Sequence, residues 1–141
     1  MKDAFGGIGN LVFIVVFLLI VIGVLGLVVS YTKAFKMKNE IISTIESYEG
    51  AKCNYDRSEC YRHIVDKASN LGYSTTDIKC PTDFENMGLF CIKSQSVVGK
   101  NNYYIYTVVT QVNIDLPVIN RIMGFRLFQV SGNTMPIELQ S

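Results

Sequence analysis

The sequence predicts an α+β protein in which one long N-terminal helix packs on a small antiparallel sheet of about four strands, with a second, short helix. Three patterns indicate this class: an uncharged apolar run near the N-terminus, an amphipathic helical pattern directly after it, and strand-like alternation in the second half of the chain. We divide the chain into a short leader (1–10), a transmembrane helix (11–30), its amphipathic continuation (31–50) and a disulfide-stabilised head (51–141).

The apolar run extends from Leu11 to Val29 without a charged residue. As a helix these 19 residues measure about 29 Å, close to the thickness of a bilayer's hydrocarbon core. A buried core helix is one alternative, but it would need apolar partners on every side. A cleaved secretory signal is the other, but the run exceeds the usual apolar length and no A-x-A-like site follows it. We expect an uncleaved, single-pass anchor.

Two glycines, Gly23 and Gly26, interrupt the apolar run. Glycine allows helices to approach closely in a membrane, so we predict that this pair takes part in helix–helix packing. The spacing is G-x-x-G and not the G-x-x-x-G of the dimerisation motif, so the sequence does not specify the partner helix.

The helical pattern continues beyond the membrane segment. Apolar residues recur there at spacings of three and four, and two more widen the stripe: Ala34, Met37, Ile41, Ile45 and Tyr48, with Phe35 and Ile42. Gly50 is suited to end the helix as a left-handed residue. We therefore predict one helix from about Gly9 to Glu49 whose second half covers the head. A coiled coil of this stripe with a second protein is an open alternative.

Four cysteines, Cys53, Cys60, Cys80 and Cys91, lie in the small head. Small domains in oxidising compartments are commonly held together by disulfides, so we expect disulfides here. Of the three possible connectivities we predict Cys53–Cys60 with Cys80–Cys91, because each pair closes a short local loop. Zinc is the alternative, but the C-x6-C and C-x10-C spacings and a single histidine, His63, do not suit it. We expect no metal and no cofactor.

The side of the membrane on which the head lies is indicated in two opposite ways. Lys33, Lys36 and Lys38 follow the apolar run, whereas only Lys2, offset by Asp3, precedes it, so the positive-inside rule favours a cytoplasmic head. The cysteines favour an oxidising compartment. We give the cysteines more weight and expect an extracytoplasmic head with the N-terminus inside. A cytoplasmic, membrane-anchored adaptor with reduced cysteines is the alternative.

The head begins with a predicted short helix over about residues 57–71, which Asp56 or Ser58 can cap and Gly72 can end. Strands then follow at Gly88–Ile92 and 102–114, joined by a hairpin turn at 99–102. In the longer strand, alternate residues share one face: Tyr104, Tyr106, Val108, Val112 and Ile114.

The last part of the chain predicts two further strands. A short connector at 118–122 precedes a strand at Phe125–Val130, and residues 131–133 are predicted to turn the chain. The final strand, Met135–Leu139, contains Pro136, which lacks a backbone donor and is therefore confined to a sheet edge.

The sequence offers no convincing catalytic group. The common nucleophile, metalloprotease and phosphate-binding motifs are missing from it. Cys60 and His63 lie three residues apart on the predicted second helix, but an oxidised Cys60 cannot act as a nucleophile. Basic and acidic residues are nearly balanced and interspersed, which argues against a nucleic-acid partner. We expect neither enzymatic activity nor a small-molecule substrate.

A short leader, an apolar helix that becomes amphipathic and a small cysteine-containing sheet domain together resemble the architecture of type IV pilins, and most of all the TadE-like minor pseudopilins of tight-adherence pilus systems. Those families have a cleavage-site glycine and a glutamate near the start of the mature helix. Here Gly6, Gly7 and Gly9 precede the apolar run, and the first glutamate after it is Glu40. The resemblance therefore supplies an architecture and no functional residues.

Two functions follow from these patterns. The resemblance implies a structural subunit, or minor component, of a bacterial type IV or Tad-like pilus or secretion apparatus, located in the cell membrane or an extracellular filament. Its helix would associate with further copies or with other pilin-like subunits. The alternative is a single-pass surface protein whose head binds a ligand or partner, with the helix only as a tether. Tyr103, Tyr104 and Tyr106 are the candidate binding face for that alternative.

Overall fold

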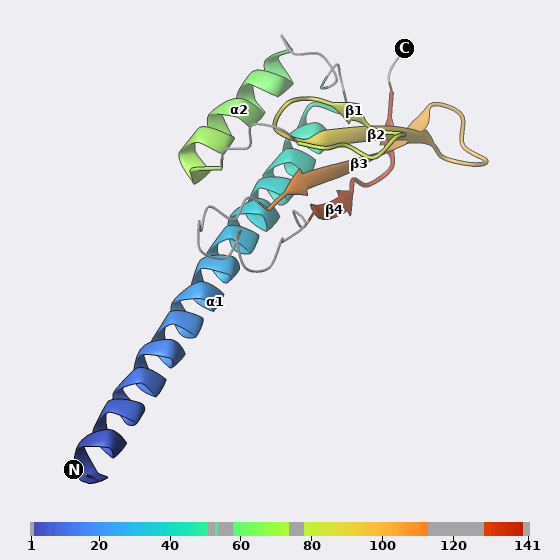
Figure 1. The fold of residues 1–141 in the computed structure, drawn as a ribbon. Helices are drawn as coiled ribbons and strands as arrows, with labels where there is room; N and C mark the ends of the chain where they lie inside the picture. Colours follow the sequence, from blue (N-terminus) through green and yellow to red (C-terminus); the bar gives the residue numbers. More distant parts are fainter. Residues whose placement is uncertain (1, 51–52, 54–57, 74–77, 113–128, 140–141) are drawn as a thin grey trace.

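The computed structural model describes residues 2–50, 53, 58–73, 78–112 and 129–139, and it has the predicted α+β architecture. One long helix, α1 (Lys2–Ser47), runs the length of the molecule, and a shorter one, α2 (Glu59–Leu71), lies beside its C-terminal half (Figure 1). The described residues form one antiparallel sheet of five strands: β1 (Glu85–Asn86), β2 (Cys91–Ser96), β3 (Tyr103–Gln111), β4 (Gln129–Asn133) and β5 (Ile137–Glu138). The head thus surrounds one half of α1, and the other half extends away from it.

The boundaries of α1 differ from the prediction at its N-terminus. The helix begins at Lys2, so residues 2–10, predicted as a leader outside the helix, are helical. No proline interrupts them, and extending a formed helix adds one backbone hydrogen bond per residue. The C-terminal end also differs, because the helix stops at Ser47 and not at the predicted Glu49. Glu49 (φ 51°), and not Gly50, is the first left-handed residue after the helix; Gly50 (φ 68°) follows it, and its N–H donates to the Ile45 carbonyl.

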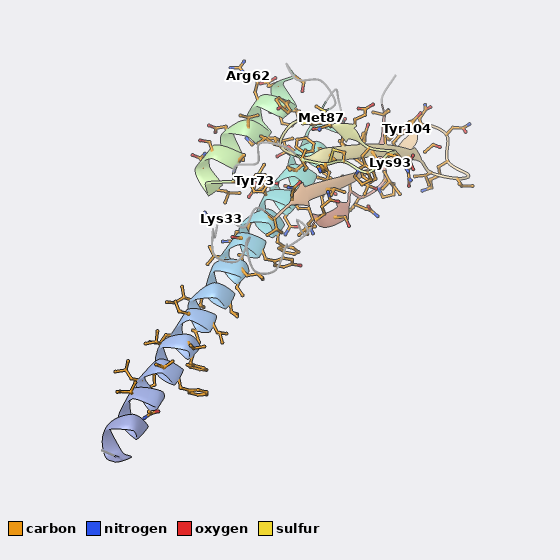
Figure 2. The ribbon with its side chains drawn as sticks, viewed as in Figure 1. Lys33, Arg62, Tyr73, Met87, Lys93 and Tyr104 are labelled. Atoms are coloured by element: carbon orange, nitrogen blue, oxygen red, sulfur yellow. A yellow bond between two sulfur atoms is a disulfide. The ribbon has the colours of Figure 1, made fainter. Side chains whose placement is uncertain are left out.

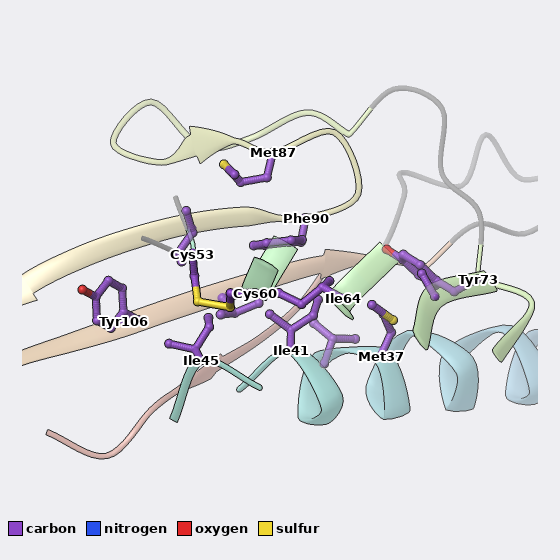
Figure 3. Close-up of a cluster of buried hydrophobic side chains, with 14 of the residues drawn as sticks. Met37, Ile41, Ile45, Cys53, Cys60, Ile64, Tyr73, Met87, Phe90 and Tyr106 are labelled. Carbon is purple, nitrogen blue, oxygen red and sulfur yellow. A yellow bond between two sulfur atoms is a disulfide. The ribbon is translucent and has the colours of Figure 1, made fainter. Parts of the chain in front are cut away.

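The C-terminal half of α1 supplies one side of the core. Its stripe Ala34, Met37, Ile41 and Ile45 is fully buried, and Ile64 of α2 and Phe90 pack in the same cluster (Figure 3). The chain's own head therefore covers the stripe, as predicted. Phe35 is an exception, because it is 42% exposed and lies outside the core.

The second helix, α2, has the predicted ends. The Ser58 hydroxyl accepts a hydrogen bond from the backbone N–H of Tyr61 (3.1 Å), and Gly72 adopts the left-handed conformation with a φ of 61°. Its buried residues are Cys60, Ile64 and Ala68. These three form one i, i+4 row, and Tyr61 and Leu71 pack against the core beside it. Val65, although next to Ile64 in the sequence, is 39% exposed.

Strand β3 is the centre of the sheet. It pairs with β2 on one side and with both β4 and β5 on the other, in the registers Lys93↔Thr107, Val109↔Ser131 and Tyr104↔Ile137. The β2–β3 hairpin turns where predicted, with Gly99 and Asn102 at positive φ. One face of β3 joins the main core, and Val109 on the other face packs with Ile78 and Cys91.

Several predicted strand boundaries are wrong. The strand predicted to end at Ile92 runs to Ser96, and the strand predicted at 102–114 leaves Val112 outside β3. The strand predicted from Gly88 begins at Cys91, because Gly88 has a φ of 88° and lies in the turn that joins β1 to β2. Residues 131–133, predicted as a turn, belong to β4 because they pair with β3. The last strand is shorter than predicted and contains only Ile137–Glu138. The connector at 118–122, Ile114 and the start of the strand predicted at Phe125 lie outside the described residues.

Strand β4 approaches α1 most closely at Gly132. A Cβ atom at this position would stand 2.8 Å from Ile42 Cδ1 and 2.9 Å from Lys38 Cδ, both closer than van der Waals contact allows. Glycine is normally unfavourable within a strand. Here the absence of a side chain allows the sheet to lie directly on the helix.

We predict that Gly132→Val destabilises the protein by roughly 1–3 kcal/mol, because the added methyl groups displace Ile42 and Lys38. The matched control is Ser131→Val in the same strand. The Ser131 side chain is exposed, so we expect a β-branched residue there to leave the stability unchanged or to raise it slightly. Urea unfolding of the detergent-solubilised full chain, followed by tyrosine near-UV circular dichroism, measures both. Equal unfolding midpoints for the two variants would contradict the close approach.

Candidate functional site: the exposed apolar half of α1

The N-terminal half of α1 is apolar and exposed on all sides. Apart from Leu27, which is partly buried, the large apolar side chains between Ile8 and Val29 expose from 37% (Val21) to 74% (Phe13) of their surface. The most apolar 18-residue window of this helix has a mean hydropathy of 3.5, and none of it is buried against the described parts of the chain. Figure 2 shows its side chains projecting around the helix away from the head. Within the described residues, this half is therefore not buried as a core helix would be.

The length and composition of this half suit a bilayer. One helix in the described residues is long and apolar enough to cross a membrane, and it lies near the N-terminus. Exposed apolar surface of this extent marks a membrane or protein contact. The structure thus presents a candidate single-pass membrane span.

Gly23 and Gly26 lie on one face of this half, because residues three apart are neighbours on a helix. Both are partly exposed. Because glycine has no side chain, the backbone of a second helix can approach more closely here than at the large side chains around it. Their role in helix–helix packing stays a prediction.

The head is fixed to α1 by hydrogen bonds as well as by packing. The buried hydroxyl of Thr110 in β3 donates to the backbone carbonyl of Ala34 (3.0 Å). The backbone N–H of Met135 donates to the Glu46 carboxylate (2.9 Å). These contacts lie near the two ends of the covered half of α1, so the sheet is attached to the helix along the whole of that half.

Two disulfides close local loops in the head: Cys53–Cys60 and Cys80–Cys91. This is the pairing that short loop closure predicts. The first joins the segment after α1 to the first turn of α2, and both of its cysteines are buried in the main core (Figure 3). The second joins β2 to the chain before β1, and Cys80 is only partly buried. The disulfides therefore hold elements that the sheet itself does not connect.

The three tyrosines predicted as a binding face do not form one. Tyr106 is buried at 4% exposure in the main core, and burial raises the pKa of its hydroxyl, with a smaller contribution from Tyr104. Tyr103 donates a hydrogen bond to Glu138 (3.0 Å), which raises its pKa. Tyr104 packs against the core and is half-buried. Tyr104 and Tyr106 thus contribute to the core, whereas Tyr103, on the opposite face of β3, is partly exposed.

His63 lies on the outer face of α2, exposed, with its ring 6.4 Å from that of Tyr48. It borders a shallow, open depression together with Arg62 and Asp66. Cys60, three residues before His63, is held in a disulfide and is not available as a nucleophile. Among the described residues, no three His, Cys, Asp or Glu side chains gather as metal ligands.

Comparison with known proteins supplies no relative: the chain matches no protein-family model, no curated protein and no solved structure. The function must therefore be argued from the fold, the exposed half of α1 and the disulfide-bonded head.

We predict that Cys53→Ala/Cys60→Ala destabilises the protein more than Cys80→Ala/Cys91→Ala. Loop closure accounts for roughly 2–3 kcal/mol in either case, but the first pair removes two fully buried sulfur atoms from the main core, whereas the second removes one, that of Cys91, from the smaller cluster. Urea unfolding of the full chain in detergent gives the two midpoints. The prediction fails if both double variants unfold at the same urea concentration.

Proposed function

We propose that this protein is a non-enzymatic, pilin-like structural subunit of a bacterial type IV or Tad-like pilus or secretion apparatus, anchored by α1 with its head outside the cytoplasm. One observation carries the proposal. The exposed apolar half of α1 continues without a break into the half on which the core of the head is built. The membrane or filament contact and the head are therefore parts of one rigid element.

A structural subunit differs from a tethered module in how rigidly its head is attached to the membrane helix. A tether needs only an apolar span, and a flexible linker after it would let the head search for ligands. Here the sheet lies against α1 from Ala34 onward, only five residues after Val29. Thr110 donates a hydrogen bond to Ala34, and Gly132 leaves room for the side chains of α1. Lateral packing of such helices would fix the positions of the heads relative to one another, as a filament or a membrane complex requires.

The disulfides support an extracytoplasmic head. Thiols in the cytosol are kept reduced, whereas small secreted domains commonly depend on disulfides. The first pair, Cys53–Cys60, is buried in the main core, so this core incorporates an oxidised pair. Weighed against the lysines after the apolar run, this favours an oxidising compartment.

We predict that the head faces outward in intact bacterial cells. Val98 at the tip of the β2–β3 hairpin is 99% exposed, so Val98→Cys provides a thiol accessible to a membrane-impermeant maleimide. Ala4→Cys, at the opposite end of the molecule, is the matched control. We expect labelling of Val98→Cys in intact cells and of Ala4→Cys only after lysis. The reverse pattern would place the head in the cytoplasm and indicate an anchored adaptor.

We predict that the exposed half of α1 mediates assembly through its glycine face. Replacing both glycines (Gly23→Ile/Gly26→Ile) should weaken co-purification of two differently tagged full-length copies about tenfold, which is about 1.4 kcal/mol. The matched control, Val24→Ile/Leu25→Ile, changes two neighbouring residues on other faces of the helix and leaves both glycines in place. A protease-resistant, disulfide-bonded head in each variant shows that folding is intact.

Three results would contradict helix-mediated assembly of copies. Wild-type copies that do not co-purify would exclude a homo-oligomer. Equal co-purification of the glycine variant and its control would exclude the glycine face. Loss of association on changing the exposed head residues Val98→Asp and Met135→Asp, with α1 intact, would instead favour a surface module that binds through its head.

A further inference from the structure

The segment of α1 that joins its two halves, Tyr31–Lys38, differs from both. We call it the border segment. It contains two aromatic residues and three lysines, and the sequence has no acidic residue between Asp3 and Glu40. Tyr31 and Phe35 are 48% and 42% exposed, although the head begins alongside them.

The aromatic side chains of the border segment form an ordered group. The Tyr31 and Phe35 rings stack at 6.5 Å between centroids, and Lys38 Nζ lies 4.2 Å from the centroid of Phe35. The Thr32 hydroxyl donates to the Val28 carbonyl (2.8 Å), so its polar group is satisfied within the helix. Aromatic rings beside cationic groups at the end of an apolar span suit the membrane–water interface, where one side is apolar and the other wet.

We propose that the border segment is an interfacial anchor that binds the phosphates of anionic lipids and seats the head directly on the bilayer surface. This inference depends on membrane insertion of α1 and not on the assembly or topology proposed above. The ligand is a lipid surface with negatively charged phosphate headgroups.

The spacing along α1 places these groups at headgroup depth. Ala34, the first fully buried residue of the core, is five residues beyond Val29, or about 7.5 Å along the helix axis. Lys33 and Lys36 are exposed and, at 100° per residue, lie on a different side of the helix from Lys38. Lys33 and Lys36 thus lie exposed just beyond the end of the hydrocarbon core, and Lys38 stands over Phe35 on another side of the helix.

Charge favours lipid over a second copy as the occupant. A parallel copy would bring its own three lysines to the same depth, and like charges at close range repel. An anionic leaflet supplies the opposite charge on every side, worth about 1 kcal/mol for each lysine near the surface. Lipid phosphates between neighbouring copies would also relieve their repulsion.

The first test measures depth. The chain has no tryptophan, so a single introduced tryptophan reports only its own surroundings. The full-length variants Phe35→Trp, Phe17→Trp and Val98→Trp are reconstituted in vesicles with lipids brominated at shallow or deep acyl positions. We expect shallow bromines to quench Phe35→Trp most, deep bromines to quench Phe17→Trp most, and neither to quench Val98→Trp.

Each other outcome decides a separate point. If Phe17→Trp is quenched but Phe35→Trp is not, α1 inserts but the border segment is no lipid anchor. If Phe35→Trp is blue-shifted, unquenched and sensitive to the protein-to-lipid ratio, a second protein covers it and the proposal is overturned. If Phe17→Trp is not quenched either, membrane insertion itself fails.

The second test measures lipid class. In the Phe35→Trp background, Lys33→Gln/Lys36→Gln is compared with Arg62→Gln/Lys100→Gln, which removes the same charge from exposed sites on the head. Arg62 lies at the far end of the head from the apolar half of α1 (Figure 2). We expect the preference for brominated phosphatidylglycerol over phosphatidylcholine to fall in the first variant only, by roughly thirtyfold if each of the two lysines contributes about 1 kcal/mol. Equal preference in both variants would overturn the proposal.

Discussion

The continuity of α1 through two different environments is the constraint on which the rest of the structure depends. Its first half presents seventeen large apolar side chains from Ile8 to Val29 to its surroundings. Leaving them in water would cost on the order of 20 kcal/mol, more than the 5–15 kcal/mol that stabilises a typical domain. The second half must at the same time bury a stripe against the head. No break separates the two, so the head has to fold where the membrane helix presents its stripe.

This constraint explains how the head is built. The sheet must lie directly on a straight helix, and Gly132 and the hydrogen bond from Thr110 to Ala34 allow close contact there. The head is also small, so its core alone gives limited stability. The Cys53–Cys60 disulfide connects the end of α1 to α2 within that core. Packing, close approach and covalent closure therefore all act on the same half of the helix.

Sequence periodicity predicted most of this fold because the relevant signals are local. The 3.6-residue stripe identified Met37 and Ile41 as core, and the left-handed glycines Gly50 and Gly72 marked the ends of both helices. The strand limits were less predictable, because pairing with β3 decides them: residues 131–133 look like a turn but extend β4. The exposure of Phe35 was not predictable from periodicity, because it depends on how far the head reaches around α1.

The candidate site was predicted in part for the same reason. An apolar run of membrane length is visible in composition alone, and the disulfide pairing follows from the shortness of the loops. The border segment was not predictable as a unit, because the spacing of its lysines does not tell which aromatic side chains between them stay exposed. The ordered group of Tyr31, Phe35 and Lys38 requires knowledge of which side chains the head leaves uncovered.

The border segment also bears on the conflict between the lysines and the cysteines. The positive-inside rule treats basic residues after a span as a record of which side stayed in the cytoplasm. If Lys33 and Lys36 bind lipid phosphates, they have a reason to follow the span on either side of the membrane, because both leaflets present phosphate. A buried disulfide favours an oxidising compartment, because thiols in the cytosol are commonly kept reduced. The lipid-anchor hypothesis and the proposed extracytoplasmic head are thus mutually consistent, because lysines that bind phosphate would not count against that topology.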